Sequence, residues 1–79
     1  MADKVIVYST PLCAPCEQVK AYLRRHGVDF VVKDLLMDED AAERLESLNI
    51  RSTPALEVDG EILAGPDLNP DRIAEVLWL

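Results

Sequence analysis

Two short apolar runs separated by one helical segment open this chain, and this pattern constrains the fold more than any other feature. Residues 4–9 are rich in β-branched side chains without strict alternation, which is typical of a strand covered on both faces. Residues 14–26 carry apolar side chains at helical spacing and end in a basic cluster before Gly27, as a helix C-terminus does. A second strand is expected at 29–35. Because the connection is a helical crossover, the two strands are predicted to be parallel.

A second helix and a hairpin are expected next. Acidic residues at 38–40 mark a helix start, and the apolar stripe that follows stops by Asn49. The apolar runs 54–58 and 61–64 flank the dipeptide Asp59-Gly60, the strongest short hairpin signal. These two runs are therefore predicted to be antiparallel strands.

A closing helix is predicted from Asn69 onward, with Asn69 as the N-cap and Pro70 at the first helical position. The predicted order is β-α-β-α-β-β-α. One four-stranded mixed sheet flanked by three helices accounts for every segment, so we expect an α/β fold. With 79 residues, the chain is expected to form a single domain over 1–79.

Composition and charge exclude several classes of function. The chain carries 15 acidic and 8 basic residues, a net charge of −7, and no basic run that would bind a nucleic-acid backbone. This acidity is interpreted as a solvated surface, with attraction to a basic partner protein as the alternative. No apolar run reaches the ~18 residues of a membrane span, and the first residues do not resemble a targeting segment. A cytoplasmic location without membrane contact is therefore expected.

The chemistry is expected at Cys13 and Cys16, which are separated by two residues. A disulfide between them would close too small a loop to stabilise a fold, so the spacing indicates redox or metal chemistry. Cys13 lies where the first predicted helix begins, and unpaired backbone N–H groups there stabilise a thiolate, so its pKa is expected to be lowered. Cys16, one turn further, is within disulfide range at ~5–6 Å. Cys13 is therefore predicted to be the nucleophile and Cys16 the resolving thiol.

Three other residues on the same helical segment are relevant to the chemistry of the cysteine pair. Pro15 fits the first helical turn and stiffens the loop between the sulfurs. Glu17 suits a helix start but opposes a thiolate on Cys16, and its net effect stays open. The only histidine, His26, is ~15 Å along the same helix, so it is interpreted as a helix-terminal cation rather than a base.

Two alternatives to redox chemistry remain for the cysteine pair. The first is a pair of buried, inert thiols. The second is a metal site, but zinc requires four ligands and one chain does not supply them near the cysteines. No metal ligand is therefore assigned within a single chain.

The segment Tyr8-Ser9-Thr10-Pro11-Leu12-Cys13-Ala14-Pro15-Cys16, the element order and Ser52-Thr53-Pro54 before the third strand together resemble the glutaredoxins. They also resemble the related small redoxins that reduce ribonucleotide reductase. The resemblance spans nearly the whole chain and implies a thioredoxin-like fold. It further implies that Pro54 is cis and lies beside the cysteines, and that the backbone of Thr53 pairs with an extended partner segment. We therefore assign Thr53 and Pro54, together with Pro15, to substrate binding.

The resemblance to glutathione-using members is partial. Thr10 stands where those proteins usually carry a Lys, Arg51 fits their basic position, and residues 64–68 keep only one glycine and one acid of their Gly-Gly-x-Asp/Ser-Asp stretch. Arg51 and Asp67 would hold the charged ends of glutathione, with ordinary surface charge as the alternative. These departures favour recharging by a thioredoxin-reductase-type flavoenzyme. Thr10 and the stretch 65–71 also depart from the ribonucleotide-reductase-linked group.

The predicted function is that of a monomeric thiol-disulfide oxidoreductase that reduces protein disulfides and holds no bound cofactor. Its electron donor is a thioredoxin-reductase-type enzyme or glutathione. One alternative is a dimer that shares an iron–sulfur cluster through Cys13 and external thiols, although the stiff loop at Pro15 favours disulfide closure instead. A second alternative is a non-catalytic interaction domain whose cysteines can be replaced without loss.

Overall fold

The structure of the chain, a computed structural model, describes residues 4–50 and 53–77. Within these residues the elements follow the predicted order, with one additional 3₁₀ turn before the last helix. Their bounds are β1 (Val5–Ser9), α1 (Ala14–Arg25), β2 (Val31–Asp34), α2 (Glu39–Ser47), β3 (Ala55–Val58), β4 (Glu61–Ala64), η1 (Gly65–Asp67) and α3 (Pro70–Leu77).

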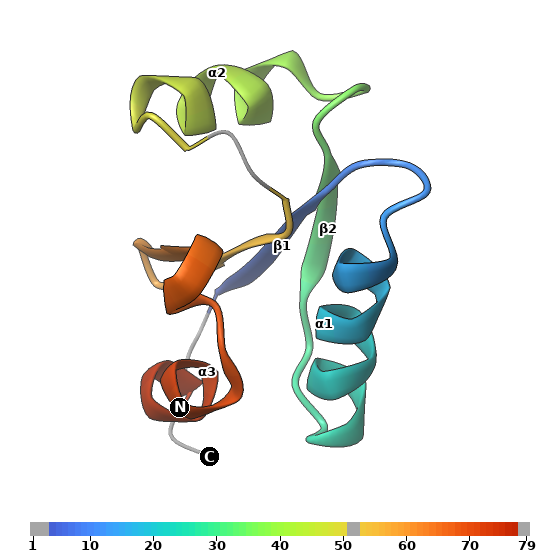
Figure 1. Cartoon of the computed structure of the whole chain (residues 1–79), viewed down its shortest axis with the longest axis vertical. Helices are drawn as coiled ribbons and strands as arrows, with labels where there is room; N and C mark the ends of the chain where they lie inside the picture. The colour runs from blue at the N-terminus through green and yellow to red at the C-terminus, as the bar shows by residue number, and fades with distance from the viewer. Residues whose placement is uncertain (1–3, 51–52, 78–79) are drawn as a thin grey trace.

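The four strands form one mixed sheet in the order β2-β1-β3-β4 (Figure 1). β1 pairs with β2 in parallel and with β3 antiparallel, and β3 and β4 form the hairpin. All five residues of β1 are buried, which confirms that it is covered on both faces. β2 lies at one edge, where Val31 and Val32 remain exposed. The predicted α/β fold with its mixed sheet is confirmed.

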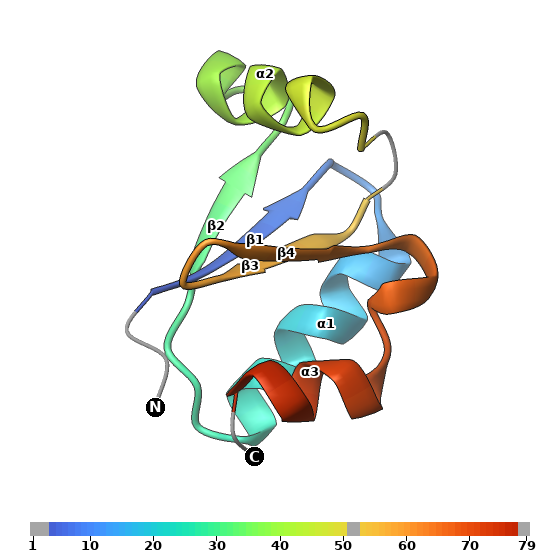
Figure 2. The same ribbon diagram turned by 90° about the vertical axis from the view of Figure 1, so that its left-hand side faces the viewer.

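Helices cover the two faces of the sheet unequally (Figure 2). Alternate residues of β1 point to opposite faces, as the pleat of a strand requires. Val5 and Val7 join the larger core, which α1 and α3 complete with Leu23, Ile73 and Leu77. The smaller core lies under α2, and its buried members are Ile6, Tyr8, Ala41, Leu45 and Ala55.

A polar network with two buried members, Tyr8 and Glu57, and one exposed member, Arg44, lies on the α2 face of the sheet. The Tyr8 hydroxyl donates to Glu57 Oε1 at 2.8 Å, and Arg44 Nε of α2 donates to the same oxygen at 2.9 Å. Tyr8 is 1% exposed and Glu57 8% exposed. Burial raises the pKa of Tyr8, and the adjacent Glu57 raises it further. Burial also raises the pKa of Glu57, but the hydrogen bonds from Tyr8 and Arg44 and the nearby cations outweigh it and lower that pKa overall. The network fixes α2 to β1 and β3.

The helix ends follow the predicted signals. The Asp38 side chain accepts from Ala41 N at 3.0 Å and caps α2. Asn69 Oδ1 accepts from Arg72 N at 2.9 Å, which confirms Asn69 as the cap of α3. Gly27, after α1, has φ of +68°, a conformation that glycine adopts without strain. Among the described residues, no helix is long and apolar enough to span a membrane.

A strand length and a short turn differ from the sequence prediction. The second strand is shorter than predicted and covers Val31–Asp34 instead of 29–35, because the ladder with β1 pairs only these four residues. Arg24 lies over the ring of Phe30, with its guanidinium carbon 5.6 Å from the ring centre, so Phe30 packs near α1 before the strand begins. The 3₁₀ turn at Gly65–Asp67 was not predicted.

Candidate active site

Cys13 is the N-cap of α1, so its sulfur lies next to the backbone N–H groups of the first helical turn. Its backbone is extended, with φ −105° and ψ 101°, and its Sγ accepts a hydrogen bond from the backbone N–H of Cys16 at 3.1 Å. Pro15 occupies the first turn of α1, where a missing N–H leaves no helical hydrogen bond unmade. A sulfur in this position receives a hydrogen bond and the positive end of the helix dipole, and both favour a thiolate over a thiol.

Cys13 and Cys16 form a disulfide, with Cα atoms 5.2 Å apart. The two sulfurs differ in access, because Cys16 is only 1% exposed while Cys13 is half-buried. Leu12, just before Cys13, is fully exposed in a left-handed conformation with φ of +59°, so the chain turns outward there. A partner can therefore approach Cys13 but not Cys16. The nucleophile and resolving roles remain predictions.

Thr53 and Pro54 lie beside Cys13, and the peptide bond between them is cis, as the family resemblance implied. Thr53 Oγ1 is 4.0 Å from Cys13 Sγ and 3.2 Å from Thr10 Oγ1. Sequence reasoning considered Thr10 only as a departure from a family pattern and missed this contact. The two threonines lie in loops that the pairing of β1 with β3 brings to the same end of the sheet.

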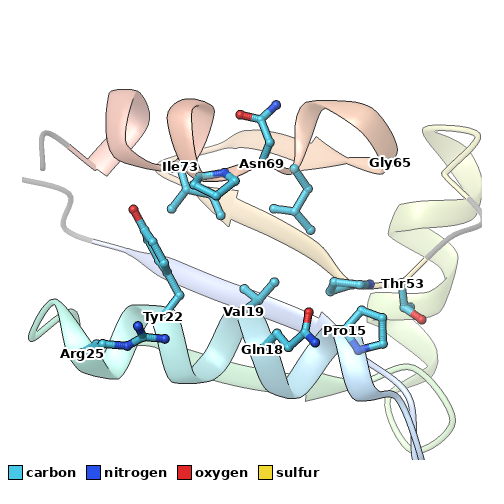
Figure 3. A pocket seen from close by; sticks show the side chains of 12 residues that line it. Pro15, Gln18, Val19, Tyr22, Arg25, Thr53, Gly65, Asn69 and Ile73 are labelled. Carbon is cyan, nitrogen blue, oxygen red and sulfur yellow. The ribbon is translucent and has the colours of Figure 1, made fainter.

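A groove of about 580 Å³ extends from this point between α1 and α3 (Figure 3). One end is formed by Pro15, Thr53 and Pro54, so the groove is continuous with the region around the sulfurs. Among the residues that the structure describes, its lining is mostly apolar and includes no carboxylate. The lining residues are Pro15, Gln18, Val19, Tyr22, Arg25, Thr53, Pro54, Gly65, Leu68, Asn69, Pro70 and Ile73.

A second hollow of about 640 Å³ lies on the other side of the disulfide, between the start of α1 and β2. Cys13, Cys16 and Leu12 line it together with Val32 at the sheet edge. Glu17 and Lys20, which also line it, form an ion pair. Lys20 therefore offsets part of the negative charge that Glu17 places next to Cys16.

The remaining predicted site residues are not all brought together. Asp67 is exposed in η1 and does not line the groove, whereas the neighbouring Gly65 does. Arg51 lies outside the described residues. His26 follows the last turn of α1 and contacts the Tyr22 ring, with the ring centres 4.5 Å apart. Among the described residues, no group of three or more His, Cys, Asp or Glu side chains is placed to hold a metal ion.

Residues 5–63 match the sequence model of the glutaredoxin family. The chain belongs to this family. A glutaredoxin-like 8.6 kDa protein encoded in the rubredoxin operon of Clostridium pasteurianum is 37% identical over 60 residues, covering 75% of this chain and 80% of that protein. The Gene 56 protein of Mycobacterium phage L5 is 38% identical over 76 residues, covering 92% of this chain and 71% of the phage protein.

Solved structures share the fold of this chain. The thioredoxin-like protein BC3987 superimposes with a TM-score of 0.81 at 32% identity, covering 92% of this chain and 99% of that structure. The glutaredoxin-like NrdH-redoxin of Escherichia coli gives a TM-score of 0.82 at 24% identity, covering 91% and 92%. This glutaredoxin therefore has the thioredoxin-like fold, with a Cys13–Cys16 disulfide at the position expected for a redox protein.

Proposed function

We propose that this glutaredoxin is a monomeric dithiol reductase of protein disulfides. The observation that carries the proposal is the unequal access of two bonded sulfurs at a helix start. Cys13 is half-buried and its Sγ accepts the Cys16 N–H at 3.1 Å, while Cys16 is only 1% exposed. This arrangement favours attack on the partner disulfide by Cys13 and release of the partner by Cys16.

The reaction begins with the reduced protein, in which the Cys13 thiolate attacks one sulfur of the partner disulfide. The Cys13–partner bond forms, the partner's own S–S bond breaks, and its second sulfur leaves as a thiolate that takes up a proton. Cys16 then loses its proton and attacks Cys13 Sγ. The Cys13–Cys16 disulfide forms, and the partner's first sulfur leaves and is protonated. The partner gains two electrons from the protein and two protons, one released by Cys16 and one from the solvent, which had taken the proton of Cys13 when its thiolate formed.

The partner segment would be held next to Cys13 by Thr53 and Pro54. An extended segment that pairs with the backbone of Thr53 adds a short strand at the site and brings its own sulfur toward Cys13. The Thr53 hydroxyl, 4.0 Å from Cys13 Sγ, lies at the edge of the region that the target sulfur would enter.

The electron donor is proposed to be a thioredoxin-reductase-type flavoenzyme rather than glutathione. Thr10 supplies no cation near Cys13 and instead bonds Thr53, and Asp67 does not line the groove that starts at the cysteines. The similarity to a thioredoxin-like protein at 32% identity supports the same choice. The NrdH-redoxin of Escherichia coli, itself glutaredoxin-like, has a thioredoxin-like activity profile. A donor of this kind places the activity in a reducing compartment such as the cytosol.

Cysteine variants test the chemical roles. The protein, pre-reduced with dithiothreitol, is mixed with a protein disulfide, and release of thiols is followed. Cys13→Ser is expected to abolish the reaction, and Cys16→Ser is expected to accumulate a mixed disulfide with the partner, seen by mass spectrometry. A Cys13→Ser variant as active as the parent would refute the nucleophile assignment.

The donor is tested separately by supplying electrons to the oxidised protein. One reaction contains NADPH and a thioredoxin reductase, and the other contains NADPH, glutathione and glutathione reductase. Faster NADPH consumption in the first reaction supports the proposed donor. Faster turnover with glutathione would reverse the choice without affecting the roles of the two cysteines.

A further inference from the structure

The groove between α1 and α3 differs in charge from the rest of this acidic molecule. The chain has 15 acidic residues, yet none of those that the structure describes lines the groove. The one charged residue in the described lining is Arg25, at the end opposite the cysteines (Figure 3). A negatively charged partner group in the groove therefore meets no carboxylate among the described lining residues.

Arg25 also differs from the other arginines that the structure describes. Arg24 lies over the Phe30 ring, Arg44 pairs with Glu57, and Arg72 pairs with Glu61 and Glu75. Arg25 is exposed and forms no ion pair with any described residue. Its guanidinium is thus available to a partner, and a planar guanidinium matches a carboxylate well.

The length of the groove determines how far from the target cysteine a bound peptide must carry its charged group. Pro15 and Arg25 are ten residues apart on α1, which corresponds to ~15 Å along the helix. An extended peptide rises ~3.3 Å per residue and points every second side chain to the same face. A residue four positions from the target cysteine is therefore ~13 Å away on the same face, and its side chain and that of Arg25 cover the remaining distance. The residue two positions away would lie over the apolar middle of the groove, at Val19 (Figure 3).

We propose that the groove binds the segment next to the target disulfide cysteine of a partner protein and selects segments with a carboxylate four residues from that cysteine. Arg25 is the specificity-determining residue, and an apolar side chain at the intervening second position packs on the groove floor. The proposal rests on the dithiol reductase function and adds the substrate class. The occupant is a protein segment because the proposed reaction reduces protein disulfides, and a chain that continues four residues beyond the cysteine places one side chain over the apolar floor and one at Arg25.

Synthetic peptide disulfides test the proposal. Each peptide has one cysteine, a leucine two positions from it and one glutamate either four or three positions from it. Two copies of the same peptide are joined through their cysteines by a disulfide. Both sets are made on the N-terminal and the C-terminal side of the cysteine. Peptides with glutamate at position three have the same net charge but point it away from the groove. The rate at which the pre-reduced protein reduces each peptide is measured by quenching samples and separating them by chromatography. This rate is divided by the rate at which dithiothreitol reduces the same peptide.

On one side of the cysteine, the parent is expected to reduce the position-four peptide about twofold to fivefold faster than the position-three peptide. The difference should decrease as salt is added, because exposed charges are screened. Arg25→Glu is expected to reverse the order. Arg24→Glu, which makes the same charge change on the adjacent residue outside the groove, is expected to keep it.

Equal rates for positions three and four on both sides in the parent would overturn the proposal. So would an Arg25→Glu variant that changes the ratio no more than Arg24→Glu does. If the pre-reduced parent reduces none of the peptides nor a protein disulfide, the dithiol reductase function itself fails. That result is distinct from active reduction without charge selection.

Discussion

Replacing Tyr8 by phenylalanine removes one buried hydroxyl and leaves the ring in place. The hydroxyl donates to Glu57 Oε1 at 2.8 Å, and Glu57 is ionised at neutral pH because its pKa is lowered. A hydrogen bond to a charged group contributes ~1.5–3 kcal/mol. Arg44 still donates to the same oxygen in the variant, so the carboxylate keeps a partner and the lower end of this range applies. We expect Tyr8→Phe to reduce the free energy of unfolding by ~1.5 kcal/mol. For a domain of this size, Tm should fall by ~6–12 °C.

The pH dependence of that loss provides a second measurement. Glu57 has a folded-state pKa below its ordinary 4.5, so its interactions stabilise the protein above that pH and are lost as pH falls through the folded value. The difference between parent and Tyr8→Phe should therefore be largest near neutral pH and shrink in acid. Urea unfolding of the oxidised protein, followed by circular dichroism, measures it.

The matched control is Tyr22→Phe, which removes the hydroxyl of the other tyrosine. Tyr22 contacts His26 through its ring, and its hydroxyl has no hydrogen-bond partner among the described residues. We expect this variant to change stability by less than ~0.5 kcal/mol. A Tyr8→Phe variant as stable as the parent, or a loss that grows in acid, would refute the role given to the Glu57 carboxylate.

Three further predictions concern the site, a helix cap and the core. In the Cys16→Ser variant, the midpoint of Cys13 alkylation should lie below the ~8.5 of free cysteine because of its N-cap position, and a midpoint at or above that value would contradict this. Asn69→Ala should cost ~1 kcal/mol in urea unfolding, because the cap of α3 is lost; an unchanged midpoint would exclude the cap as a stabilising feature. Leu56→Ala, at a fully buried position, should cost ~2–5 kcal/mol, and a loss below ~1 kcal/mol would show that the core rearranges to fill the space.

The order of the elements was predictable because each has a local signal. The β-branched run before Ser9, the Asp59-Gly60 dipeptide and the Asn69-Pro70 helix start depend on backbone preferences of adjacent residues, which the sequence displays directly. The positions of Cys13 and Cys16 at the start of α1 followed from the same reasoning. Strand ends were less predictable, because β2 extends only as far as its partner β1 allows.

Contacts between distant segments were not predictable from local signals. Tyr8, Arg44 and Glu57 come from three different elements, and although Glu57 stands inside the apolar run 54–58, the sequence does not show which residues it contacts. The same holds for the contact of Thr10 with Thr53, which depends on two loops meeting. The family resemblance supplied the proximity of Thr53 and Pro54 to Cys13, and only the fold supplies the groove with Arg25.

The alignment of β3 against β1 couples correct folding to activity. A slip of β3 by two residues would keep every side chain on its present face but move Thr53 ~7 Å along β1, away from Cys13. Such a molecule would keep its packing but lose the contact of Thr53 with Cys13. Lys4 and Asp59 oppose that error at the far end of the pair, because Asp59 N donates to Lys4 O and Lys4 N donates to Asp59 Oδ1, both at 2.9 Å. A contact distant from the sulfurs thus helps to hold the loop that carries Thr53 in line with Cys13.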